Sequence, residues 1–309
     1  MVLCCVSLGV FLITPAVNNE IQMEKSDAFS FAARITSDVF RLLRIAIFVR
    51  RIRKAIAWSK ESLGYASAKG YGRKMQNVCV VIPDLSKQCP HLVGQEPQAF
   101  FAVYESHGGI EAAECAGRSL HQAMSESTQF ESNAQSAIAE GFFHTSEKID
   151  DLPGGSTTSA TSMLIREREI YLGWVGDSHA VMSRDGRAVP LTQGEFDPDH
   201  ALGALHKSQG QPKLACTAIE AKDQFVIVAS AALWEAIPPQ QAVNLVTEFL
   251  HVFGDSRAAS EELMDEALRK QKPRSEANVS VVVVWFQETQ LSPPGKLVVA
   301  DKINAIADA

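Results

Sequence analysis

The chain has 309 residues, 46% of them hydrophobic and 21% charged, which are the proportions of an ordinary globular protein with a sizeable core. The formal net charge of −7 at pH 7 gives no support for nucleic acid as the main partner. Six cysteines without a CxxC pair indicate reduced thiols in a cytoplasmic protein, and they argue against a zinc site or a disulfide framework.

Residues 1–60 differ in character from the rest and are predicted to form a separate N-terminal region. Residues 1–17 contain no charged side chain, but this run is shorter than the roughly 20 residues that span a membrane. A signal peptide would need a positively charged start, which is absent. The run is therefore a signal-peptide core, an anchor, or a buried or disordered apolar leader, and we favour the leader.

Residues 41–58 interleave arginine and lysine with large apolar residues in the sequence RLLRIAIFVRRIRKAIAW. This is the pattern of a basic amphipathic helix, which binds anionic membrane surfaces or calmodulin-like proteins. The pattern is equally typical of a helix that packs on the following domain and leaves a basic face in water. Both interpretations stay open, and the first would associate this cytoplasmic protein with a membrane through its N-terminus.

Residues 61–287 are predicted to form one domain, followed by a peripheral tail over residues 288–309. Apolar and β-branched runs predict strands over residues 78–85, 100–104, 156–165, 169–175, 179–183, 225–230 and 279–286. Apolar positions three and four residues apart predict helices over residues 110–124, 134–149, 240–253 and 258–270. Strand meanders with helices grouped in pairs indicate an α+β fold of mainly antiparallel sheets covered by helices.

Two connections between these elements have contrasting character. Arg184-Asp185-Gly186-Arg187 predicts a hairpin turn between two strands. Residues 192–224 contain Gly203, Gly210 and Pro212, which predict an irregular connection.

The stretch Phe100–Gly109, FFAVYESHGG, predicts a buried strand that delivers a polar turn, where two glycines allow close backbone approach. Five further blocks accompany it in order, at residues 73–77, 155–160, 174–181, 228–235 and 275–282. Together the six blocks resemble the metal-dependent protein phosphatases, the PPM or type 2C serine/threonine family. The resemblance implies a four-layer α-β-β-α sandwich of two mainly antiparallel sheets flanked by helix pairs, and hydrolysis of phosphoserine or phosphothreonine.

The resemblance also implies a metal centre, in which two divalent cations share a hydroxide that attacks the phosphorus. Carboxylates would hold these Mg²⁺ or Mn²⁺ ions at positions where this sequence has Gln76, Asn77, Glu105, Ala231 and Ala277. Ser106 likewise replaces the glycine of the family's Asp-Gly pair. Glu105 alone keeps a negative charge, and two dications held by one carboxylate would repel each other with little compensation.

Three further residues have roles implied by the resemblance. Asp177 stands where some family members hold an additional metal ion, so Glu105 and Asp177 are the residual candidates for one weakly bound cation; we favour Asp177 as a structural turn residue. His107 stands where the family has a histidine suited to proton transfer to the leaving group, and without a metal hydroxide we expect a buried remnant. Arg73 is next to the position of the phosphate-binding arginine and is a candidate substitute.

The lost carboxylates favour a catalytically inactive protein of this family that needs no metal and binds a protein partner or a phosphoprotein. The alternative is a weak, atypical serine/threonine phosphatase that uses Mg²⁺ or Mn²⁺. Residues 192–224 also lack the family's substrate-contacting run, which favours the first hypothesis.

Overall fold

The computed structural model describes residues 63–68, 70, 74–192, 211–272 and 275–286. In these residues two five-stranded sheets form, with antiparallel pairing throughout. The first sheet has, in spatial order, β1 (Leu63–Ala68), β10 (Val279–Trp285), β9 (Asp223–Ala229), β6 (His179–Arg184) and β7 (Arg187–Pro190). The second sheet has β2 (Asn77–Ile82), β3 (Gln98–His107), β4 (Thr157–Arg166), β5 (Glu169–Val175) and β8 (Lys213–Ala218).

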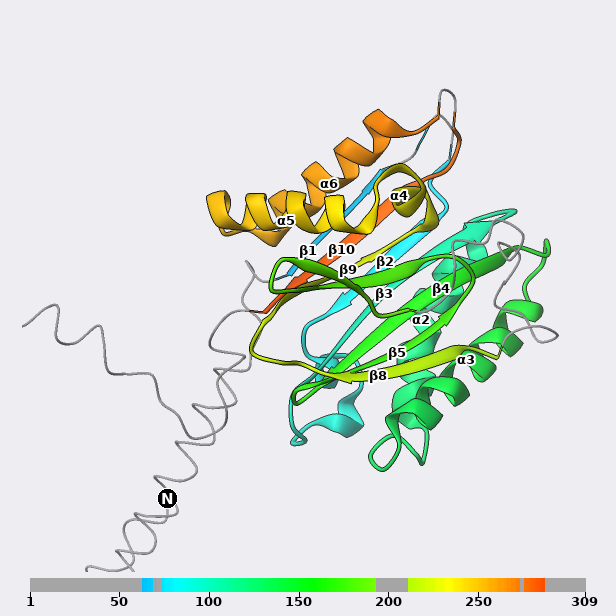
Figure 1. The fold of residues 1–309 in the computed structure, drawn as a ribbon. Helices are drawn as coiled ribbons and strands as arrows, with labels where there is room; N and C mark the ends of the chain where they lie inside the picture. The colour runs from blue at the N-terminus through cyan, green and yellow to red at the C-terminus, as the bar shows by residue number, and fades with distance from the viewer. Residues whose placement is uncertain (1–62, 69, 71–73, 193–210, 273–274, 287–309) are drawn as a thin grey trace, which may run out of the picture. The chain divides into compact units, whose positions relative to one another are not determined.

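Helices cover the outer face of each sheet (Figure 1). The second sheet carries α2 (Glu111–Glu126) and α3 (Ala134–Asp150), and the first carries α4 (Ala231–Ala236), α5 (Pro239–Phe253) and α6 (Ser256–Lys270). The predicted α+β fold, with two antiparallel sheets between helix pairs, is therefore confirmed.

Three apolar layers hold these elements together. The layer between the sheets combines side chains from both, among them Phe101, Met163, Trp174, Val228 and Val282. One outer layer joins β3 to α2 and α3 through Phe100, Leu120 and Phe142, and the other joins β9 and β10 to the remaining helices. Because successive side chains of a strand point to opposite faces, β3 buries Phe100 in one layer and Phe101 in the next. This two-sided burial explains its uninterrupted apolar sequence.

Helices α2 and α3 approach closely at Gly141. A Cβ added there would lie 2.9 Å from Met124 Cβ and 3.0 Å from the Met124 backbone nitrogen, which is too close for either to stay in place. We expect Gly141→Ala to destabilise the protein by about 1–2 kcal/mol, because overpacking outweighs the gain of about 1 kcal/mol in helix propensity. Urea unfolding measures this change. Lys148→Ala, at an exposed site of the same helix, is the control, and a stability gain in Gly141→Ala would contradict the close packing.

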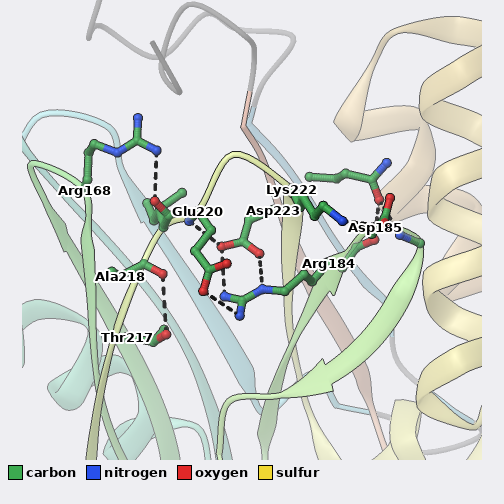
Figure 2. A network of polar contacts seen from close by, with 12 residues as sticks. Arg168, Arg184, Asp185, Thr217, Ala218, Glu220, Lys222 and Asp223 are labelled. Carbon is green, nitrogen blue, oxygen red and sulfur yellow. Dashed lines mark hydrogen bonds and ion pairs between the residues drawn. The ribbon is translucent and has the colours of Figure 1, made fainter. Parts of the chain in front are cut away.

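The predicted hairpin turn joins β6 to β7, with Arg184 paired to Arg187. Asp185 and Gly186 have φ of 54° and 74°, which fits the two-residue turn that matches strand twist. Figure 2 shows the polar network beside this turn. Arg184 donates from Nε to Asp223 Oδ1 at 2.7 Å and from Nη2 to Oδ2 at 3.2 Å, while Asp223 is only 1% exposed.

The same network fixes the connection between β8 and β9. Glu220 donates its backbone N–H to Asp223 Oδ2 at 2.7 Å and forms an ion pair with Arg184 at 2.8 Å. Arg168, in the turn between β4 and β5 of the second sheet, donates to the carbonyl of Ile219 at 2.9 Å (Figure 2). Lys222 adds an exposed ion pair with Asp185. The network therefore ties the crossing segment to both sheets.

Several element boundaries differ from the sequence predictions. The strand predicted over residues 78–85 ends at Ile82, because Asp84 caps a 3₁₀ turn at Leu85–Lys87 and accepts the backbone N–H of Ser86. The segment 192–224, predicted to be irregular, supplies strand β8 at the edge of the second sheet. Strands β1 and β7 and helix α4 were not predicted, and β9 ends at Ala229 rather than at Ser230.

The apolar run 1–17, the basic segment 41–58 and the tail 288–309 lie outside the described residues. Among the residues with described structure, no helix has both the length and the apolar character needed to cross a membrane. Four cysteines fall in the described part, Cys79, Cys89, Cys115 and Cys216, and none of these four forms a disulfide.

Candidate functional site

Strand register brings the positions implied by the resemblance to one end of the two sheets. Asn77 begins β2 and lies opposite Glu105 of β3. From the other sheet, Ala231 begins the helix that follows β9, and Ala277 stands two residues before β10. The network of Figure 2 lies at the other end, where β6 finishes and β9 begins.

Glu105 is the buried carboxylate of this site, with 8% of its surface exposed. Its Oε2 accepts the backbone N–H of Ala231 at 3.2 Å. Burial raises the pKa of Glu105 from 4.5 to about 7, and the charges of Asp177 and Glu235 contribute in the same direction. The bonds from Ala231 and Ser178 oppose this increase but do not cancel it.

Asn77 turns its amide toward the other sheet. Its Nδ2 donates to the carbonyl of Asn278 at 3.2 Å, and Asn278 Nδ2 donates to the carbonyl of Lys74 at 3.3 Å. Asn77 and Asn278 are 6% and 7% exposed, so water competes little for these bonds. Asn77 therefore acts as a hydrogen-bond donor in the place where the resemblance implies a carboxylate ligand.

Asp177 lies half-buried in the turn between β5 and β6, directly after Gly176, whose φ is 90°. The turn is held by Thr161, which donates from Oγ1 to the carbonyl of Ser178 at 2.6 Å. Burial lowers the pKa of the neighbouring His179, and the charge of Asp177 partly opposes this. Asp177 thus combines a place in a structured turn with an electrostatic effect on Glu105.

The remaining predicted residues are distributed as follows. His107 was expected to be buried, which is wrong: it is exposed at the last position of β3, where the strand leaves the core. Ser106 is buried and donates from Oγ to the carbonyl of Thr157 at 2.9 Å. Gln76 is half-buried, and its carbonyl accepts the N–H of Ser106 at 3.2 Å. Arg73 lies outside the described residues.

These side chains do not fit a centre of two divalent cations. Ala231 and Ala277 offer no side-chain oxygen, Asn77 presents an N–H group to Asn278, and Glu105 already accepts a bond from Ala231. In the part of the chain with described structure, no three histidine, cysteine or acidic side chains are grouped so as to hold a metal. Mg²⁺ and Mn²⁺ require several oxygen ligands, mostly charged, to offset their own charge.

Two residues of this region were missed from the sequence. Glu235 lies in α4, and its charge reaches Glu105, as its effect on the pKa of Glu105 shows. Asn278 supplies both an acceptor and a donor to the contact between the sheets. Both residues lie within the blocks 228–235 and 275–282, and this placement is the sequence signal that points to them.

Two layers of helices around two antiparallel sheets form a four-layer sandwich, with the site at one end of the sheets. The family model described as protein phosphatase 2C matches residues 62–200 and 195–275. The chain therefore belongs to the protein phosphatase 2C family, whose members generally depend on Mg²⁺ or Mn²⁺.

The chain is 27% identical over 259 residues to the mouse protein named protein phosphatase 1E, a match that covers 71% of this chain and 34% of that protein. It thus spans about a third of that relative's length. It is also 27% identical over 247 residues to probable protein phosphatase 2C 22 of Arabidopsis thaliana, covering 65% of this chain and 62% of the relative.

Solved structures share the fold at low sequence identity. A C. elegans sex determining protein superposes with a TM-score of 0.64 and 18% identity, over 77% of this chain and 66% of the other. A serine-threonine phosphatase 2C from Toxoplasma gondii superposes with a TM-score of 0.62 and 14% identity, over 75% and 97%. At these identities the superpositions support the fold alone.

Proposed function

We propose that this chain is a catalytically inactive member of the protein phosphatase 2C family that acts by binding a protein partner or a phosphoprotein. One observation carries the proposal. Of the five positions at which the resemblance implies carboxylate ligands, only Glu105 is charged, and its Oε2 already accepts the backbone N–H of Ala231.

The core gives the second line of support. All three apolar layers consist of buried side chains that pack together, and β2 and β3, which carry Asn77 and Glu105, pair in a continuous register. A fold that keeps its packing while its ligand positions become alanine and amide is suited to recognition, because binding needs a stable surface but no metal hydroxide. The phosphorylated form of a partner is the natural target of a fold shared with enzymes that recognise phosphoserine and phosphothreonine.

The alternative function is a weak metal-dependent serine/threonine phosphatase. The charges of Asp177 and Glu235 both raise the pKa of Glu105, so both carboxylates lie close enough to Glu105 to act on it. A single cation held weakly by Glu105 and Asp177 would reduce the repulsion between them. This possibility keeps Mg²⁺ or Mn²⁺ as the cofactor of any residual activity.

A phosphatase assay decides between the two. With millimolar Mn²⁺ or Mg²⁺, on a phosphopeptide and on p-nitrophenyl phosphate, we expect no metal-dependent turnover, because the ligands for a second cation are absent. We also expect the same phosphopeptide to bind with equal affinity in EDTA and in millimolar Mn²⁺ or Mg²⁺, as measured by fluorescence anisotropy. Turnover that requires metal and is lost in Glu105→Ala would establish the alternative.

Restoring the ligands tests how much of the site is missing. In Asn77→Asp/Ala231→Asp/Ala277→Asp we expect Mn²⁺ binding by calorimetry but only partial activity, because residues 192–224 also lack the family's substrate-contacting run. The matched control is Asn133→Asp/Ala218→Asp/Ala221→Asp, which adds the same charges at three exposed positions away from the site. Equal Mn²⁺ affinity in both triple variants would count against a surviving metal scaffold.

A further inference from the structure

The site positions join the two sheets directly. Asn77 and Glu105 belong to the second sheet, while Ala231 and Asn278 follow β9 and precede β10 of the first. Two hydrogen bonds between these four residues cross this boundary, from Asn77 Nδ2 to the Asn278 carbonyl at 3.2 Å and from Ala231 N–H to Glu105 Oε2 at 3.2 Å. We call these four residues the inter-sheet clasp.

Further bonds anchor the clasp on each side. Ser230 donates from Oγ to the same Asn278 carbonyl at 3.3 Å and accepts the N–H of Ser280 at 3.0 Å, which fixes β9 against β10. On the side of the second sheet, Asn278 Nδ2 donates to the carbonyl of Lys74, just before β2. Ser230 and Ser280 are fully buried, so these bonds form away from water.

Three of the four clasp positions, Asn77, Glu105 and Ala231, are ones at which the resemblance implies metal ligands, and Asn278 directly follows a fourth, Ala277. These positions come from both sheets. Cations held there would join the sheets through carboxylates, whereas in this chain amide and backbone groups bond to each other without an ion. We propose that the inter-sheet clasp is a metal-independent replacement for the cation bridge, so that the native fold needs no divalent cation at this end. The clasp concerns the stability of the fold and can fail while the proposed binding function stands.

The test is the unfolding equilibrium in urea, measured with EDTA and with millimolar Mn²⁺. We expect the wild-type unfolding constant to be the same in both, within about twofold. Asn77→Asp replaces the Nδ2 donor with a carboxylate that faces the Asn278 carbonyl and lies opposite Glu105. In EDTA we expect its unfolding constant to rise about 10–100-fold, because a buried acceptor loses its donor and two carboxylates meet.

Two variants separate the possible causes. Asn77→Ala removes the bond without adding charge, and we expect a rise of about tenfold that Mn²⁺ does not reverse. It also keeps the test decisive if Asn77→Asp does not fold. Asn133→Asp is the matched control, because Asn133 caps α3 by accepting the N–H of Ser136, which aspartate does equally well.

Either of two results would overturn the proposal. One is a wild-type unfolding constant that falls more than tenfold on adding Mn²⁺, since the fold would then depend on the cation. The other is an Asn77→Ala protein as stable as Asn133→Asp, since the cross-sheet bond would then contribute nothing.

Discussion

Asp223→Ala is expected to destabilise the protein by about 3–5 kcal/mol, the largest effect of any single substitution we consider. Asp223 is 1% exposed and receives two bonds from Arg184 and one from the Glu220 backbone (Figure 2). Its removal leaves Arg184, whose side chain is 29% exposed, without its buried counter-charge. It also frees the connection between β8 and β9. Urea unfolding at pH 7 measures the loss.

A nearby pair of the same charges provides the control. Lys222 and Asp185 form an ion pair at 3.3 Å, but both side chains are 70% exposed. Lys222→Ala should therefore cost no more than about 1 kcal/mol, because water screens the pair. The double variant Asp223→Ala/Arg184→Met should recover part of the loss, since the only charge it leaves without its Arg184 partner is Glu220, which is 58% exposed. Equal costs for Asp223→Ala and Lys222→Ala would contradict the role of burial.

The second large effect concerns Glu105 and depends on pH. Burial raises its pKa in the folded protein from 4.5 to about 7. At a pH between these two values, Glu105 keeps its proton in the folded state but has released it in the unfolded chain. The wild type therefore loses stability as pH rises from about 4.5 to 7, and the full penalty remains above pH 7. The difference between the two pKa values corresponds to a loss of roughly 3 kcal/mol in the free energy of unfolding.

Glu105→Gln avoids this penalty, because the glutamine is neutral and its Oε1 can still accept the Ala231 N–H. We expect the variant to be more stable than the wild type by roughly 3 kcal/mol at pH 8, and equally stable at pH 4. Thermal or urea unfolding across this pH range provides the measurement. Glu248→Gln, on the exposed face of α5, is the matched control and should show no such difference. If Mn²⁺ abolished the difference at pH 8, the metal-dependent alternative would gain support.

Much of the fold followed from local pattern. β5 was predicted with its observed ends, Glu169 and Val175, and α5 and α6 within two residues, because their apolar positions face a single core layer. β1 was missed because LGYASA has few large apolar residues and becomes a strand by pairing with β10, far away in sequence. β8 was missed because its residues are exposed or half-buried, as expected for an edge strand.

The site was predictable only as a set of side-chain types. The resemblance led to Glu105, Asn77 and Ala231, and the register of β2 and β3 brings the first two opposite each other. The hydrogen bonds that these residues form could not be predicted, because their partners include the Ala231 N–H and the Asn278 carbonyl. Backbone groups are the same at almost every position, so the sequence does not indicate which of them will bond. The exposure of His107 depends on where β3 leaves the core, and sequence patterns do not locate strand ends to one residue.

The pairing of the first strand with the last has a consequence for how the protein folds. Leu63 pairs with Val284 within the first sheet, and the bond from Asn77 to Asn278, which joins the two sheets, spans 201 residues. The first sheet and its bond to the second therefore depend on contacts of very high sequence separation. Such contacts require closure of long loops before they give any stabilisation, which slows folding. During synthesis, β1 cannot pair with β10 until nearly the whole domain has left the ribosome. Until β10 arrives, β1 and one side of β9 remain open edges, which makes this interval the period of greatest risk of aggregation.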